Sequence, residues 1–317
     1  MPTALKNWLG TLTDVRRDEW KPVALMLFYG FLAMTSYYVV KPARNAIFVD
    51  RVGSENLPYV YIITAIVVSL VMVGYSRWVS RIKHLTLLLG TFAFLASNLV
   101  LFRWLLLQET FLVSGIFYVW GKLYPLLLVS QFYLVGNLLF TTRQAKRLFG
   151  PIGVGLIMGG IAGSSVAGWS TAALGTENLL LLAAGMLGVC AMLVLALSPH
   201  MGRGEDAGSR RLVGKVSGDA IRLLFQSAHL RWIAIILMTT ILVTTLIDWQ
   251  FNTAVDMFIP GEDEKTEFFG RFFLALNIAS VTIQLLFTSF VLRKWGVGVA
   301  LLALPAGLLL TSVGIFL

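Results

Sequence analysis

The chain has 317 residues, of which 57% are hydrophobic and 13% are charged, and its mean hydropathy is +0.81. Soluble globular domains are roughly 45–50% apolar and about 25% charged, so this composition excludes an ordinary soluble domain. The net charge of +9 does not by itself indicate a nucleic-acid-binding protein, because Lys and Arg also accumulate in the cytoplasmic loops of membrane proteins.

Apolar runs of about 20 residues recur along most of the chain, and each is long enough to cross a bilayer as a helix. We expect an all-α polytopic membrane protein whose spans comprise residues 22–41, 57–76, 85–107, 111–140, 150–173, 178–197, 232–255, 268–292 and 298–317. If the polar segment 1–21 is cytoplasmic, most of the 25 Lys and Arg residues fall in inside segments, as the positive-inside rule requires. We therefore expect the lipid bilayer to be a partner of the protein, and we expect no binding of nucleic acid.

The spans fall into two groups separated by the polar connection 198–231. Residues 22–197 would form a first half of six spans, and residues 232–317 would supply three spans of a second half. Within the connection, GDAIRLLFQSAHLRW has the apolar period of a helix that lies in the membrane interface. Two six-helix halves that rock about a central site are the plan of major-facilitator transporters. Because the last run stops at Leu317 without a polar flank, we expect a longer twelve-span parent, which needs roughly 100 more residues.

Two cations, Lys41 and Arg44, follow the first apolar run and flank Pro42. In the predicted topology they lie on the outer side, where cations are scarce. One interpretation is that both side chains snorkel as headgroup anchors. The interpretation that we favour places them at the outer mouth of a substrate path.

A third cation, Lys122, lies about 16 Å from the outer start of the fourth predicted span, near the bilayer midplane. Gln131 and Asn137 follow on the same helix. A charge at this depth costs about 2.5–3.5 kcal/mol and calls for a partner or a cavity. Lys122 either joins a structural network between helices or, as we favour, binds or gates an anion in a wet cavity.

Asp248 is the only acid inside a predicted span, and Asn252 shares its helix face at i+4. We expect Asp248 to pair with Lys122, Lys41 or Arg44 across the interface between the halves. Such a pair would serve as a gate or as a counter-ion that the substrate displaces.

The fifth span contains a stripe of small residues, Gly155, Gly159 and Gly163, that allows another helix to approach closely. We expect close packing, as at a moving interface of a transporter; ligand contact by the glycines is the alternative. The three histidines lack the spacing of metal ligands, Cys190 has no partner for a disulfide, and no catalytic constellation is present. We therefore expect that the protein binds no metal ion or cofactor and that it is not an enzyme.

Several motifs resemble the ATP:ADP antiporter (TLC) family, the nucleotide transporters of plastids and obligate intracellular bacteria, and its major-facilitator-like bacterial relatives. The first-helix pattern of that family, basic-x-x-Lys-Asp with a later Gly, acid and Pro, is similar to KPARNAIFVDRVGSENLP at 41–58. Further similarity lies in KLY (122–124), FY (132–133), Asn137, AKRLFG (145–150), DWQFNTAVDMF (248–258) and EFFGRFFLALNIASVTIQLLF (267–287).

The resemblance implies alternating-access transport, and by position it places the transport-associated Lys of the family on Arg44. The Asp that follows falls on Asn45 and the fourth-helix acid falls on Lys122, so both depart from the family pattern. The extra cation favours a more anionic substrate, or exchange has been lost. We expect a secondary transporter of an anionic small molecule, with ATP/ADP exchange as one candidate, in the bacterial inner (plasma) membrane. The alternative is a non-transporting membrane module that anchors or regulates a cytoplasmic partner or a fused soluble domain.

Overall fold

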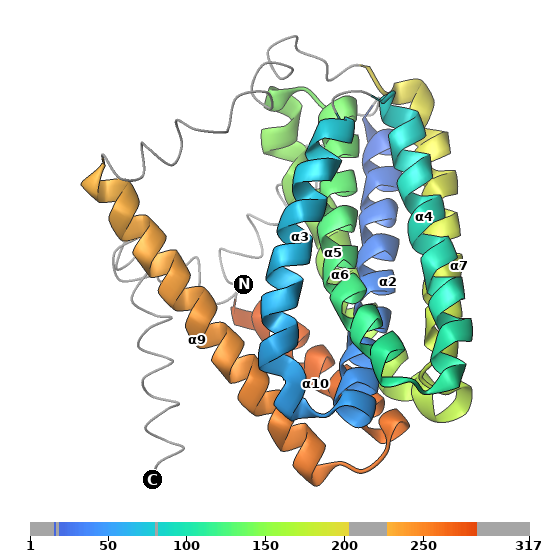
Figure 1. Ribbon diagram of the computed structural model, residues 1–317. Helices are drawn as coiled ribbons and strands as arrows, with labels where there is room; N and C mark the ends of the chain where they lie inside the picture. The colour runs from blue at the N-terminus through green and yellow to red at the C-terminus, as the bar shows by residue number, and fades with distance from the viewer. Residues whose placement is uncertain (1–15, 17–18, 80–81, 203–226, 284–317) are drawn as a thin grey trace.

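The computed structural model describes residues 16, 19–79, 82–202 and 227–283, and the helices and strands assigned among these residues are all helices. Six long helices stand side by side as a bundle (Figure 1), and two more follow the long connection. The bundle comprises α2 (Trp20–Val52), α3 (Leu57–Val79), α4 (His84–Leu105), α5 (Phe111–Leu139), α6 (Thr142–Leu174) and α7 (Asn178–Leu197). The later helices are α9 (Ala228–Phe258) and α10 (Glu262–Ile283), and short 3-10 turns occupy Ser54–Asn56, Leu106–Gln108 and Ser198–His200.

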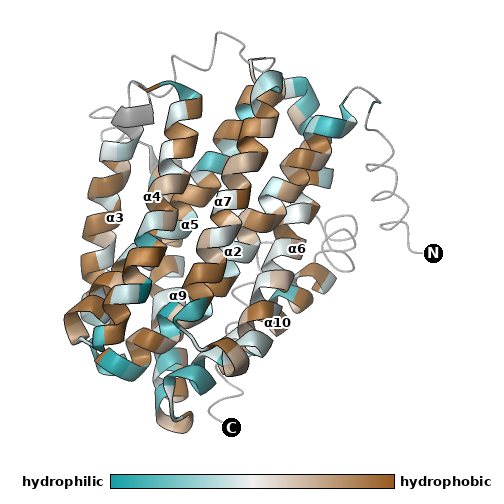
Figure 2. Cartoon of the chain, turned by 90° about the vertical axis from the view of Figure 1, so that its right-hand side faces the viewer, coloured by the Kyte–Doolittle hydropathy of each residue, from teal (hydrophilic) through white to brown (hydrophobic). Residues whose placement is uncertain are grey.

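Seven of the described helical segments are long and apolar enough to cross a membrane, and they correspond to the first seven predicted spans. Apolar residues run along the helices in Figure 2, whereas hydrophilic residues gather mainly near the helix ends. The prediction of an all-α polytopic membrane protein is confirmed. The predicted eighth span, 268–292, is described only as far as Ile283, within α10. The ninth span, 298–317, and most of the predicted interfacial helix lie outside the described residues.

Helix α2 is longer than predicted, because it continues through Pro42 as far as Val52 rather than ending at residue 41. The predicted span ended where the apolar run reaches the two cations. Proline removes one helical hydrogen bond and disfavours helix in the residue before it, yet α2 runs through Pro42. In the structure α2 lies at the centre of the bundle and packs against α5, α6, α7 and α10. These neighbours bury the stretch from Pro42 to Val49 and hold it helical. Lys41 and Arg44 therefore lie inside a helix, not at its end.

The packing between α2 and α6 depends on the predicted glycine stripe. A Cβ atom added at Gly155, Gly159 or Gly163 would lie 2.3–2.4 Å from a backbone carbonyl oxygen of α2. In a bilayer, close van der Waals contact of this kind replaces the hydrophobic effect as the force between helices. The stripe thus joins two helices of the six-helix bundle. The contact between α6 and α10 involves another glycine pair, Gly168 and Gly270.

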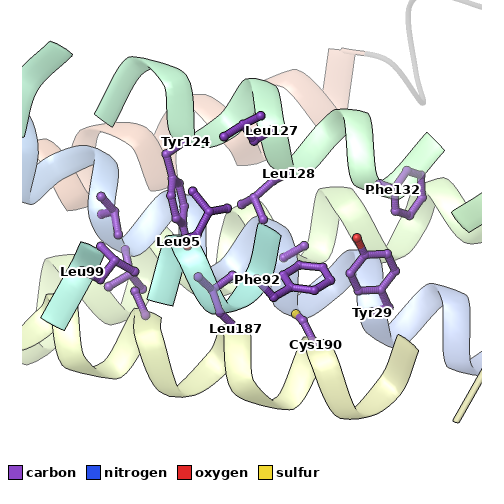
Figure 3. Packing of buried hydrophobic residues seen from close by; sticks show 14 of the residues in the cluster. Tyr29, Phe92, Leu95, Leu99, Tyr124, Leu127, Leu128, Phe132, Leu187 and Cys190 are labelled. Carbon is purple, nitrogen blue, oxygen red and sulfur yellow. The ribbon is translucent and has the colours of Figure 1, made fainter. Parts of the chain in front are cut away.

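Large apolar side chains fill the bundle on the other side of α2. Tyr29 packs against Phe92 and Phe132, and Cys190 of α7 lies in the same buried cluster (Figure 3). Tyr124 of α5 is fully buried beside Ser36 of α2. This tightly packed side of the bundle is a scaffold that fixes where α2 and α5 present their polar residues.

Helix α9 meets the bundle mainly at one end, here named the Gly53 end, where Arg51 and Gly261 also lie. Helix α10 begins at the same end and packs along α6 as far as Gly160. Helix α9 crosses close to the bundle there and diverges from it toward Ala228 (Figure 1). In the diverging part, apolar side chains such as Ile236 and Ile241 are more than 60% exposed in the described chain.

Arg51 of α2 is the centre of one group of polar contacts at the Gly53 end. Its Nε atom donates to Glu262 of α10 at 2.6 Å, its Nη2 to Glu177 at 2.9 Å, and its Nη1 to the carbonyl oxygen of Leu106 at 2.5 Å. Burial raises the pKa of Glu262 to about 7, and Arg51 opposes this rise, whereas Glu177 and Asp50 add to it. Arg51 thus ties α10 to the bundle.

Lys265 of α10 is the centre of a second group, in which its ammonium donates to Asp50 of α2 at 2.9 Å and to Asp256 of α9 at 3.0 Å. Burial disfavours the charged ammonium, but the two carboxylates outweigh it and raise the pKa of Lys265. Trp249 of α9 also donates to the carbonyl oxygen of Ser54 at 3.1 Å. The Gly53 end is therefore where the late helices and the bundle are joined by charge.

Candidate functional site

Three cations and one acid converge where α2, α5 and α9 approach one another. Lys122 Nζ of α5 lies 4.0 Å from Asp248 Oδ2 of α9, and Lys41 and Arg44 of α2 are close enough to Lys122 to repel its charge. We name Lys41, Arg44, Lys122 and Asp248 the cation group. Its positive charges outnumber its single negative charge.

The sequence predicted Arg44 at the mouth of a path, but the structure buries it inside the bundle, with 2% of its surface exposed. Asn45 Oδ1 accepts hydrogen bonds from Arg44 Nε at 3.1 Å and from Nη2 at 2.7 Å, and the Gly121 carbonyl oxygen accepts one from Nη1 at 3.1 Å. The guanidinium carbon lies 5.0 Å from the centroid of the Tyr118 ring, a cation–π distance. No carboxylate of a described residue lies within 4.0 Å of this guanidinium.

A glycine at position 121 is required for this placement of Arg44. A Cβ atom there would lie 2.4 Å from Arg44 Cδ, closer than real Cβ contacts come. The sequence places Gly121 directly before Lys122, so one turn of α5 both holds Arg44 and presents Lys122.

The predicted pairing of Asp248 with a cation is present, because Lys122 is its neighbour. The Tyr61 hydroxyl of α3 donates to the same Asp248 oxygen at 2.8 Å. Lys122 also lies over the Tyr61 and Tyr118 rings, at 5.5 Å and 5.2 Å from their centroids. At 4.0 Å, with side chains 31% and 39% exposed, Lys122 and Asp248 form a loose pair that a third charged group can enter.

Lys41 contacts α10 rather than an acid. Its ammonium lies 3.7 Å from the centroid of the Phe273 ring and 5.5 Å from that of Tyr38. An ammonium over an aromatic face is stabilised by the quadrupole of the ring. The cation group therefore touches the bundle, α9 and α10 together.

The remaining predicted site residues lie elsewhere or make local contacts. Asn252 is fully buried, and its amide donates to the Asp248 carbonyl oxygen of its own helix at 2.6 Å. Gln131 donates to Tyr75 and Thr91 and so connects α5 with α3 and α4. Asn137 is exposed near the end of α5. The described contacts do not bring Gln131 or Asn137 to the cation group.

Sequence reasoning missed the aromatic residues around the cation group. Tyr118 lies one helical turn before Lys122 and Tyr38 one turn before Lys41, so the spacing rule for helix faces could have identified both. Tyr61 and Phe273 belong to other helices, and only the tertiary packing brings them to the cations.

One family model and two curated relatives match the chain. The model of the family described as TLC ATP/ADP transporter matches residues 205–317. The chain is 26% identical over 220 residues to ADP,ATP carrier proteins 1 and 2, chloroplastic, of Arabidopsis thaliana, and each alignment covers 63% of this chain. The alignments cover 34% and 35% of the lengths of the two relatives, so the chain spans about a third of the length of the curated relatives that it matches. No solved structure matches the chain. The chain is thus similar to the TLC ATP/ADP transporter family over residues 205–317 and, more distantly, to these two chloroplast carriers.

Proposed function

We propose that the chain is part of a secondary transporter that moves a small organic anion by alternating access, with ATP/ADP exchange as the first candidate. The observation that carries this proposal is the excess of positive charge in the cation group, between the bundle and the late helices. The two chloroplast relatives, which are named ADP,ATP carriers, support a nucleotide as the anion.

An anionic substrate would neutralise the excess positive charge of the cation group. Each charge held within a bilayer costs about 2.5–3.5 kcal/mol on insertion scales, so a group of cations with too few acids is expensive without an anion. Phosphate and carboxylate groups satisfy guanidinium and ammonium donors through strong charge-assisted hydrogen bonds. In this proposal Asp248 is the counter-ion of Lys122 when the site is empty, and the substrate displaces it.

Alternating access assigns a role to the two parts of the chain. Residues 1–21 would be a cytoplasmic N-terminal segment, and residues 22–197 would form the first half. Residues 198–231 would be the cytoplasmic connection, and residues 232–317 would form part of the second half. The distribution of Lys and Arg supports a cytoplasmic N-terminus, with the Gly53 end outside. The membrane in this proposal is a bacterial inner membrane. Polar contacts at that end, together with the divergence of α9 from the bundle, support a state closed to the outside.

Uptake by the full-length protein in proteoliposomes tests this function. Labelled ATP, ADP and other organic anions would be supplied outside vesicles that either contain or lack unlabelled anion. We expect saturable uptake that Lys122→Ala and Arg44→Ala lower about tenfold or more, because each removes a charged hydrogen-bond donor.

Arg103→Ala is the matched control, since Arg103 is a basic residue of α4 that donates to Asn178 and lies outside the cation group. This variant should transport at nearly the wild-type rate. If folded wild-type protein takes up none of the anions, the proposed function is wrong.

A further inference from the structure

The acceptors that hold Arg44 leave part of its guanidinium free. An arginine side chain has five N–H donors and no acceptor. Asn45 Oδ1 takes one hydrogen from Nε and one from Nη2, and the Gly121 carbonyl takes one from Nη1. One hydrogen on Nη1 and one on Nη2 therefore remain without an acceptor among the described residues.

The positions of the two acceptors identify the free edge. Asn45 occupies the side that Nε and Nη2 share. Gly121 lies against Arg44 Cδ and its carbonyl accepts from Nη1, an arrangement that suits the Nη1 hydrogen on the Cδ side. The free hydrogens are then the parallel pair at the tip of the guanidinium, which fits two oxygens of one phosphate or carboxylate.

The second observation concerns charge. Both acceptors of Arg44 are neutral amide oxygens, although only 2% of the surface of Arg44 is exposed. A buried cation without an anion is costly, and the charged neighbours Lys41 and Lys122 are themselves positive. Asp248 lies beside Lys122 and Tyr61 instead.

From these observations we propose that Asn45 is a positioning residue for anion binding. It fixes the tip of Arg44 toward a phosphate or carboxylate group of the substrate and, being neutral, leaves the charge of Arg44 available. The inference rests on the proposed function and adds to it the chemical group that Arg44 recognises. An aspartate at position 45 would keep the same hydrogen bonds but neutralise the cation.

The test compares Asn45→Asp with the wild type in full-length protein. Uptake in proteoliposomes gives KM for whichever of ATP, ADP or inorganic phosphate the wild type transports fastest, and thermal unfolding in detergent gives the melting temperature. We expect Asn45→Asp to raise KM about tenfold or more while the melting temperature stays equal or rises, because the new carboxylate pairs with Arg44. A purely structural role would instead leave KM unchanged.

Acidification provides a readout that a structural role would not move. As pH falls, the introduced carboxyl becomes neutral, so the KM of Asn45→Asp should approach that of the wild type at the same pH. Arg44→Lys keeps the charge but lacks the planar edge, and we expect a rise in KM of about tenfold for it as well. If Asn45→Asp does not fold, this variant decides the question.

The possible failures are distinguishable. The inference is overturned if the wild type takes up an anion and Asn45→Asp has an unchanged KM. If Asn45→Asp does not fold, an unchanged KM in Arg44→Lys overturns it. In both cases the proposed function stands. No uptake of any of the anions by the wild type overturns the proposed function, and the inference with it.

Discussion

Single side chains determine what the cation group can bind. The sequence identified Lys122 and Asp248 because charges inside apolar runs are costly and therefore conspicuous. It could not show that Asp248 would lie next to Lys122 rather than Lys41, since Asp248 lies 126 positions after Lys122 and on another helix. Nor could it show that Arg44 is buried, because its burial depends on the packing of α2 against other helices.

Asp248→Asn tests the counter-ion at this scale. In the proposed function Asp248 is a counter-ion that the substrate displaces from Lys122. We therefore expect its neutralisation to lower the dissociation constant for the transported anion several-fold. Equilibrium binding to purified full-length protein measures this change. Asp256→Asn, on the same helix but bound to Lys265, is the control and should bind as the wild type does. Weaker binding by Asp248→Asn would mean that the acid only supports the fold.

Helices pack here through backbone contact as much as through side chains. Small residues at every fourth position were sufficient to predict close packing of α6, yet not its partner, because several helices could have used the same stripe. The structure assigns the stripe to α2, and the neighbouring Gly168 to α10. The length of α2 was missed for a related reason, since the packing that overrides Pro42 is tertiary.

Gly159→Ala tests the contact between α2 and α6. The added Cβ would lie 2.3 Å from the Phe31 carbonyl oxygen, so we expect destabilisation of about 1–3 kcal/mol and a lower melting temperature in detergent. Gly153→Ala on the same helix meets nothing within 4 Å and should melt as the wild type does or slightly higher. Equal melting of all three proteins would contradict the packing described here.

At the scale of the whole molecule, charge joins α9 and α10 to the bundle at the Gly53 end. The sequence predicted the two groups of spans and their orientation from Lys and Arg counts. It could not predict which end is joined, because pairs such as Arg51 with Glu262 connect residues that only the fold brings together.

Lys265→Gln tests this junction, because it removes the charged donor that joins Asp50 of the bundle to α10. Spin labels at exposed Leu112 and Met257 would report the separation of α5 and α9 by pulsed electron paramagnetic resonance. We expect longer distances in Lys265→Gln. Arg103→Gln is the control, since it removes a charged donor to Asn178 within the bundle and should leave the distances unchanged. Identical distributions in both variants would show that the Lys265 contacts do not hold the end closed.

The pH dependence of the same distances follows from Glu262. Burial raises its pKa from 4.5 to about 7 in the joined arrangement, so that arrangement binds a proton that a separated, solvent-exposed Glu262 releases. Protonation of Glu262 therefore stabilises the joined arrangement. This stabilisation is fully present below pH 4.5, the ordinary pKa of a glutamate, and is lost as the pH rises through about 7. Distances should shorten on acidification, and Glu262→Gln should remove this dependence. Lengthening on acidification would contradict the assignment.

The account depends most on an anion being bound by the cation group. Equilibrium binding of labelled ATP to purified full-length protein, compared between wild type, Lys122→Ala and Arg103→Ala, tests this claim directly. We predict saturable binding by the wild type and by Arg103→Ala, and about tenfold or more weaker binding by Lys122→Ala. Equal affinity in all three proteins, or no binding of ATP, ADP or any other organic anion by the folded wild type, would contradict it.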